Sequence, residues 1–341
     1  MRLLFPVVGL LIATSLGACS YTARQESPTA VAAPVPMPSL QLGVDIDFYT
    51  SPGANVMPTA LQDIAYIKSL HANAVSISFP FYTNKAGTAL GALPTTPSVA
   101  ALGTLIATAE TAGLAVTVRP VLNEAALGES RVHWTPAHLG SWFTAYQHFL
   151  LPYAALAQRD HVAVFVIGTE LSIFSTAPEW ATLRAAMAAV YHGQLAFSDN
   201  WTARRNATAG LTEMIDAYAP VPLDDNASVS ALAAGLAYWA RTLPSGSVLS
   251  EVGIAAQSGA YSHPWELGSN TAPIEPQIQA NWFSAQCQAV TIDHLGGIYF
   301  WPVYFGQSLT VPDKADGPTA WAATPGATAI AKCFAALGPS S

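Results

Sequence analysis

The chain has 341 residues, of which 51% are hydrophobic and only 10% are charged, and its formal net charge is −8. A composition this apolar can bury a large core, which excludes an intrinsically disordered chain. The negative charge, without any cluster of Lys and Arg, argues against nucleic acid as a partner, because neutralising phosphates needs clustered cations.

The N-terminus has the pattern of an export signal. Arg2 precedes an apolar run from Leu3 to Ala13 that is too short to span a bilayer as a stable helix. The sequence "LGAC" that ends at Cys19 resembles the bacterial lipobox, where the signal is removed and the cysteine is lipidated. A secretory signal with a chance cysteine is the alternative. We expect a lipoprotein signal over residues 1–18 and an exported protein, anchored by lipid to the outer face of the plasma membrane or to the outer membrane.

The rest of the chain divides into a tether and one folded domain. Residues 19–39 are rich in Pro, Ala and Ser and have no helical or strand period, which predicts a flexible tether. Residues 40–338 alternate short apolar runs with longer amphipathic segments. The strand-like runs are 42–49, 74–82, 114–122, 162–170, 193–201, 214–222, 247–255 and 296–304. The helix-like segments are 57–71, 98–112, 136–158, 177–191, 227–243 and 275–290.

This alternation predicts an α/β fold with a parallel sheet, since each crossover helix covers a face of the sheet. Eight strand-and-helix units over about 300 residues match a single-domain (β/α)₈ TIM barrel better than a doubly wound sheet. No GxGxxG sequence follows the first strand, so a dinucleotide-binding fold has no support.

Two carboxylates stand at strand ends, where the active site of this barrel lies. Glu170 closes the run "VAVFVIGTE" and Glu251 closes "SVLSE", so each lies where a strand meets its loop. Two inward glutamates from opposite sides of a narrow mouth can flank one glycosidic bond. Retaining hydrolysis needs two carboxyl groups roughly 5–5.5 Å apart, a nucleophile and an acid/base. A solvated loop charge or a helix cap is the alternative for either residue.

Other polar and aromatic side chains at the strand ends complete the predicted site. Tyr218 could donate its hydroxyl to an ionised nucleophile on the neighbouring strand, or it could simply pack at the rim. Sugars present apolar faces, so tryptophans serve as platforms in glycan clefts. Arg119 could bind sugar hydroxyls or satisfy a structural carboxylate. The substrate-binding candidates are Trp301, Trp201, Trp265, Asn200, Arg119, Thr169 and Tyr82.

These motifs resemble those of a known enzyme family. "GTELS" and "SEVGIAA" look like the catalytic motifs of retaining (β/α)₈ glycosidases of clan A, and most closely those of glycoside hydrolase family 113, the β-mannanase-like group. "DAYAPV", "GIYFWPV", Pro264-Trp265 and the Gln277/Gln279 pair are further matches, so the resemblance runs from about residue 42 to 335.

The resemblance implies roles for individual residues. It makes Glu170 the acid/base and Glu251 the nucleophile of a double displacement on a β-linked oligosaccharide or polysaccharide, such as a β-mannan. Most clan members have an Asn immediately before the acid/base, where it bonds the sugar 2-hydroxyl. Here Thr169 takes that place, and family 113 resembles this chain in having Thr there. The segment "VRPVLNEAALGES" matches the family pattern only loosely.

Other functions have less support. A non-catalytic carbohydrate-binding lipoprotein of the cell envelope on the same scaffold is the main alternative, but both glutamates are present. The histidines fall mostly on helices or outer loops, which disfavours a metal site, and GxSxG is absent. We therefore expect a monomer that needs no metal or cofactor. Cys287 and Cys333 could form a disulfide or remain as two buried thiols.

Overall fold

The computed structural model describes residues 35–202 and 210–338, all of which belong to one compact unit. The predicted signal, Cys19 and most of the predicted tether lie outside these residues. Within the described part of the chain, no helix combines the length and the hydropathy that a membrane span requires.

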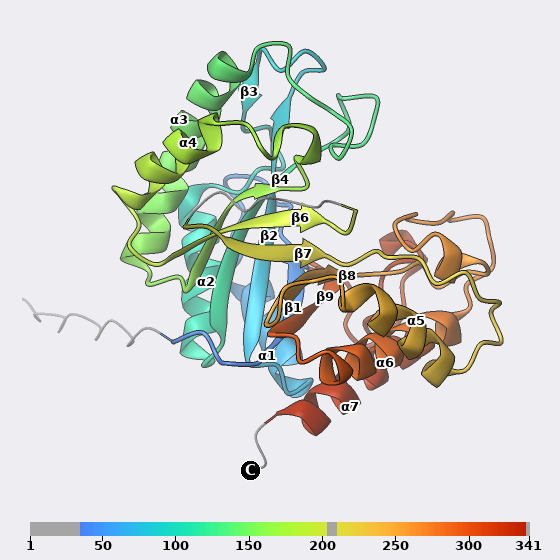
Figure 1. Ribbon diagram of the computed structural model, residues 1–341. Helices are drawn as coiled ribbons and strands as arrows, with labels where there is room; N and C mark the ends of the chain where they lie inside the picture. The colour runs from blue at the N-terminus through green and yellow to red at the C-terminus, as the bar shows by residue number, and fades with distance from the viewer. Residues whose placement is uncertain (1–34, 203–209, 339–341) are drawn as a thin grey trace, which may run out of the picture. The chain divides into compact units, whose positions relative to one another are not determined.

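The centre of the fold is a closed barrel of eight parallel strands (Figure 1). The strands are β1 (Gln41–Asp47), β2 (Ala74–Thr83), β4 (Ala115–Leu122), β5 (Val164–Thr169), β6 (Gln194–Asn200), β7 (Thr212–Asp216), β8 (Val248–Val252) and β9 (Gly297–Tyr304). Each pairs with its neighbours, and β1 pairs with both β2 and β9, which closes the barrel. The predicted TIM barrel and its eight strands are confirmed.

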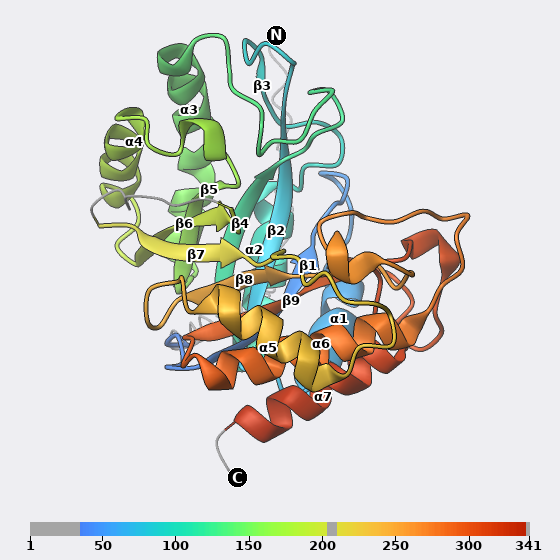
Figure 2. The same cartoon turned by 45° about the vertical axis from the view of Figure 1, so that its right-hand side comes forward.

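Helices lie outside the strands (Figures 1 and 2). They are α1 (Met57–Ser69), α2 (Val99–Thr111), α3 (Leu139–Arg159), α4 (Glu179–Ala188), α5 (Val229–Ala240), α6 (Pro276–Ile292) and α7 (Pro325–Leu337). The first six correspond to the predicted helical segments. The last was not predicted, although it has a sequence signal: the Thr324 side chain accepts from the backbone N–H of Gly326, and Pro325 occupies the first turn.

Short elements decorate the ends of the strands. The two-residue strand β3 (Leu90–Gly91) pairs antiparallel with the end of β2, beyond the barrel proper (Figure 2). The single-turn helices are η1 (Ser172–Phe174), η2 (Ala260–Ser262) and η3 (Lys314–Asp316). None of the four follows from periodicity, because each is shorter than one period of the hydrophobic pattern.

The inside of the barrel changes character along its axis. Near the N-terminal ends of the strands it is filled by a small apolar cluster: Ala74, Ala115, Val164, Val166, Ala196, Met214, Val248 and Tyr299. Nearer the C-terminal ends, Asp45, Arg119 and Asp216 are all completely buried. Buried charges are tolerated only when they are paired, so this end of the barrel must contain an internal polar network.

Cys287 of α6 and Cys333 of α7 form a disulfide, and their Cα atoms are 5.8 Å apart. The bridge joins residues separated by 46 positions. In the chain-entropy model, closing a loop of that length contributes about 4 kcal/mol. It fastens the last helix of the outer ring to its neighbour.

Candidate active site

A buried arginine forms the floor of the site. Arg119 Nη1 lies 3.0 Å from Asp45 Oδ2, and its Nη2 lies 2.5 Å from Asp216 Oδ2. The same Nη2 lies 2.6 Å from Glu251 Oε2. Burial alone would lower the pKa of Arg119, but the three carboxylates together raise it above its usual value, so the guanidinium stays charged. Its side chain is wholly buried, and its partners are these carboxylates and the backbone oxygen of Ser250 at 3.4 Å, so no part of it is open to a sugar.

Serine hydroxyls donate hydrogen bonds to the carboxylate oxygens of Asp45 and Asp216 that Arg119 does not contact. Asp216 Oδ1 accepts hydrogen bonds from Ser198 at 2.7 Å and from Ser250 at 2.9 Å. Asp45 Oδ1 accepts one from Ser78 at 2.8 Å. Burial raises the pKa of both aspartates, while Arg119 and the hydroxyls oppose that rise. Small hydroxyl residues at inward positions of otherwise apolar strands are the sequence signal of this layer.

Two side chains hold Glu251, Arg119 of β4 and Tyr218, which follows β7. Its Oε2 pairs with Arg119, and its Oε1 accepts a hydrogen bond from the Tyr218 hydroxyl. Burial, and then the charge of Glu251, raise the pKa of Tyr218 well above its usual value, so the tyrosine keeps its proton and acts as a donor. Glu251 is only 6% exposed. The geometry fixes one carboxylate with both oxygens engaged.

Glu170 follows β5 in a strained conformation. Its φ of 52° lies in the left-handed region, which is unfavourable for a residue other than glycine. Gly168 allows the strand to reach this point, because a Cβ there would lie 2.5 Å from the ring of Phe197. The turn directs the Glu170 side chain to Asn200, whose Nδ2 donates to Oε1 at 2.7 Å.

A second arginine contacts the other oxygen of Glu170. Arg131 Nη2 lies 2.8 Å from Glu170 Oε2, and it comes from the loop between β4 and α3. Glu124 Oε1 fixes that loop by accepting from the backbone N–H of Arg131 at 2.7 Å and from Ser130 Oγ at 2.9 Å. Arg131 was missed in the sequence. Its loop position is set by the fold, and the only hint is that it is one of few cations in the chain.

Trp301 lies next to the Glu251 side of the mouth. A Cβ on Gly253 would come within 2.7 Å of Trp301 Cε3 and 3.2 Å of Tyr218 Oη. The glycine two residues after Glu251 therefore allows both aromatic side chains to approach the strand. Trp301 is half-buried, and its ring meets that of Tyr304 edge-on at 6.1 Å.

A pair of tryptophans comes from two loops, Trp201 directly after β6 and Trp265 between β8 and α6. The rings of Trp201 and Trp265 stack at 5.6 Å with an interplanar angle of 18°. Trp201 directly follows Asn200, the donor to Glu170. Trp265 is 44% exposed, so one face of the pair is available at the surface. An apolar platform next to a carboxylate is suited to a sugar ring.

Two other predicted substrate contacts have structural partners instead. Thr169 is buried, and its hydroxyl donates to the backbone oxygen of Pro120 at 3.1 Å, so it is turned toward the neighbouring strand. Tyr82 is half-buried and shares a 2.5 Å hydrogen bond with Thr95 near β3. Each hydroxyl has a partner within the protein, and its contact with a sugar stays a prediction.

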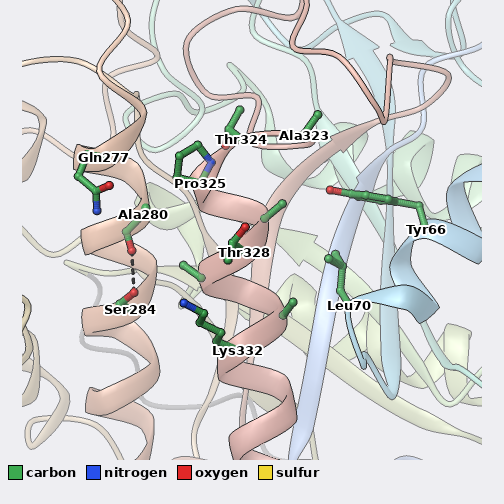
Figure 3. Close-up of a pocket in the computed structure, with 13 residues that line it drawn as sticks. Tyr66, Leu70, Gln277, Ala280, Ser284, Ala323, Thr324, Pro325, Thr328 and Lys332 are labelled. Carbon is green, nitrogen blue, oxygen red and sulfur yellow. Dashed lines mark hydrogen bonds between the residues drawn. The ribbon is translucent and has the colours of Figure 1, made fainter.

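Elsewhere the described residues offer less chemistry. No three His, Cys, Asp or Glu side chains in residues 35–202 and 210–338 are grouped as metal ligands. A pocket of about 680 Å³ lies between α1, α6 and α7. Figure 3 shows its lining residues, among them Tyr66, Gln277 and Lys332. It lies on the outside of the barrel and contains no carboxylate, so it is separate from the two glutamates.

Comparison with known proteins agrees with this geometry. Residues 46–315 match the model of Glycoside Hydrolase Family 113. The GH113 β-mannanase of Alicyclobacillus acidocaldarius, solved in complex with ManMIm, has a TM-score of 0.72 and 18% identity over 88% of this chain and 98% of that chain. A GH113 β-1,4-mannanase has a TM-score of 0.74 and 17% identity over 87% of this chain and 99% of that one. No curated protein matches the chain in sequence.

Proposed function

Because the chain belongs to glycoside hydrolase family 113, and is therefore a glycoside hydrolase acting on a carbohydrate, we propose that it cleaves a β-mannan-like glycan with retention of configuration. The observation that supports this most is the pair of strand-end glutamates with different partners. Glu251 pairs with the buried Arg119, whereas Glu170 pairs with Arg131 of a loop. The separation of roughly 5–5.5 Å that retention requires stays a prediction.

In the proposed first step, Glu251 attacks the anomeric carbon while Glu170 gives its proton to the glycosidic oxygen. The bond to the leaving sugar breaks, and a glycosyl ester forms on Glu251. Arg119 and Tyr218 orient the attacking group, because each contacts one of its two oxygens.

In the second step, Glu170 takes a proton from water, and the water oxygen attacks the anomeric carbon from the side that the leaving group vacated. The ester to Glu251 breaks, and the product has the configuration of the substrate. Asn200 and Arg131 orient Glu170 for both steps, because they contact one oxygen each. Trp301 supports the sugar that reacts, and the Trp201 and Trp265 pair supports the leaving group.

A mannan-type substrate is proposed because the similar solved structures are described as β-mannanases. The test is hydrolysis of β-1,4-mannan, glucomannan, cellulose and xylan, with the product anomer followed by NMR. We expect cleavage of mannan with a β-anomer as the first product, and no cleavage by Glu251→Gln. Release of the α-anomer would overturn the mechanism, and cleavage of xylan or cellulose alone would overturn the substrate.

We also propose that the enzyme is exported and anchored through a lipid on Cys19, on the basis of the "LGAC" sequence. The test is detergent partitioning of the protein expressed with its own N-terminus. We expect the parent in the detergent phase and Cys19→Ser in the aqueous phase. If both partition into detergent alike, the anchor is not on this cysteine.

A further inference from the structure

Asp47, the last residue of β1, is a carboxyl that the proposed reaction does not use. Its Cα pairs with Ser78 of β2 and Tyr304 of β9, so it stands at the end of the barrel where both glutamates lie. Side chains alternate along a strand, and Asp45, two residues earlier, points inward to Arg119. Asp47 therefore also points inward, one layer nearer the mouth.

Asp45 and Asp47 differ in what satisfies them. Asp45 is completely buried, and both of its oxygens have partners, Arg119 and Ser78. Asp47 is half-buried, and among residues 35–202 and 210–338 no group is hydrogen-bonded or ion-paired with its carboxyl, which is therefore open to solvent or to a ligand. Polar groups in protein interiors are generally hydrogen-bonded. A carboxyl group at the mouth that has no partner within the protein is suited to a hydrogen bond with a hydroxyl group of the substrate.

The charges around Asp47 fit contact with neutral hydroxyls. Burial raises the pKa of Asp47 to about 8, and the nearby Asp45 and Glu251 raise it further while Arg131 opposes them. The group is therefore mainly protonated at neutral pH. A neutral carboxylic acid can donate one hydrogen bond and accept others, and it does not repel the charge on Glu251.

The position of Asp47 indicates which part of the substrate it faces. In the barrel, β9 lies between β1 and β8. Trp301 belongs to β9 and Glu251 to β8. The acid/base contacts the leaving group from β5, with β2 and β4 between β5 and β1. The sugar over β8, β9 and β1 is therefore the glycone, on the far side of the scissile bond from the leaving group.

We propose that Asp47 is a specificity-determining residue that binds hydroxyl groups of the glycone sugar. This inference rests on the proposed function and adds a contact that selects the sugar. Losing one such hydrogen bond in a buried site should lower kcat/KM about 10- to 100-fold. A purely structural aspartate would lower the rate on every substrate by a similar factor.

The test pairs enzyme variants with substrate variants. Wild type, Asp47→Ala and Asp47→Asn are assayed on aryl β-mannobioside and on analogues that each lack one hydroxyl of the glycone, with the exposed Asp224→Asn as control. For at least one missing hydroxyl, we expect kcat/KM of wild type to fall about 10-fold or more. The same analogue should lower kcat/KM of Asp47→Ala by less than about 3-fold. Asp47→Asn, which keeps a donor and an acceptor, should lie between them. Asp224→Asn should follow wild type.

Each other outcome has a definite meaning. If every deoxy analogue lowers kcat/KM of Asp47→Ala by the same factor as that of wild type, Asp47 does not bind the glycone. If Asp47→Ala does not fold, the comparison of Asp47→Asn with wild type decides in the same way. If wild type hydrolyses no β-mannoside, the proposed substrate fails, and calorimetric binding of mannotriose and its deoxy analogues decides for Asp47. Absence of both hydrolysis and binding would overturn the inference too.

Discussion

The two glutamates of the mouth are held by different kinds of structure. Glu251 is fixed by Arg119, which is wholly buried and pairs with two further carboxylates, and by Tyr218. Glu170 is fixed by Asn200 and by Arg131, whose side chain is 18% exposed and belongs to a loop. In the proposed mechanism Glu251 keeps one charge state, whereas Glu170 must gain and lose a proton. A wholly buried network suits the first role, and a partner from a loop, with part of its side chain at the surface, suits the second.

The largest effect should come from Glu251→Ala, which removes the group that forms the covalent bond. We expect turnover to disappear on natural and activated substrates alike. Added azide can then replace the nucleophile only by direct attack, which gives an inverted product, and NMR of that product is the measurement. A retained azide product from this variant would contradict the role of Glu251.

Glu170→Ala should separate the two residues. Acid assistance is worth about 10²–10⁴-fold when the leaving group is poor, so the loss should be that large on glycans and smaller on activated aryl glycosides. Azide should speed the second step and give a product of retained configuration. Equal losses on both substrate classes, without azide rescue, would contradict the acid/base role.

Arg119→Met should damage the fold as well as the reaction. Removing one partner of a buried charge network costs about 3–5 kcal/mol, because Asp45 and Asp216 are left without their cation. The matched control is Arg159→Met, because Arg159 pairs with Asp160 but its side chain is 65% exposed, and a surface change costs about 0.5 kcal/mol or less. Urea unfolding measures both. Similar values for the two variants would show that the Arg119 network is not a stabilising floor.

Arg131→Met should slow the reaction with little effect on stability. A hydrogen bond to a charged group is worth about 1.5–3 kcal/mol, so kcat/KM should fall about 10- to 100-fold, while the urea midpoint stays near that of wild type. Arg131→Lys should recover part of the rate, since it keeps the charge without the planar fork. A loss of stability as large as that of Arg119→Met would remove the distinction between the two sides of the mouth.

The last prediction concerns the pH dependence of stability. The pKa of Asp47 is raised from 3.8 to about 8 by burial, so the folded state holds its proton more tightly than the unfolded state. The stability from this group is fully present below the unfolded pKa and is lost as the pH rises to about 8. Asp47→Asn should therefore lose less stability than wild type between pH 5 and 8 in urea titrations. Equal losses would show that Asp47 is solvated like an ordinary carboxyl.

The sequence was sufficient for the barrel because each strand is a continuous apolar run and each helix has its own period. It also located Glu170, Glu251 and Tyr218, since strand ends converge at one mouth of the barrel. Arg131 could not be found in this way. Its contact with Glu170 spans 39 positions and depends on how Glu124 folds the loop, which no local pattern encodes.

The roles of Arg119 and Thr169 show a second limit. Both lie at strand ends, where substrate contacts are expected, yet Arg119 reaches across the barrel to carboxylates of β1, β7 and β8. Thr169 bonds the backbone of the neighbouring strand β4. For Thr169 the local register decides, because the pairing of β5 with β6 shifts between Val166 and Thr169. For Arg119 the closure of the barrel decides, since its partners come from strands that are not its neighbours. Only the three-dimensional structure determines which oxygen or nitrogen each side chain contacts.

The central claim, that Glu251 is the nucleophile, is tested most directly by trapping the intermediate. A 2-deoxy-2-fluoro-β-mannosyl fluoride slows release of the sugar from the enzyme, because the fluorine destabilises the transition state of the second step, while the fluoride leaving group still allows the first. Peptide mass spectrometry after digestion then locates the label. We expect one fluorosugar per active chain, attached to Glu251. A label on Glu170, or none in an enzyme that hydrolyses β-mannosides, would contradict the account.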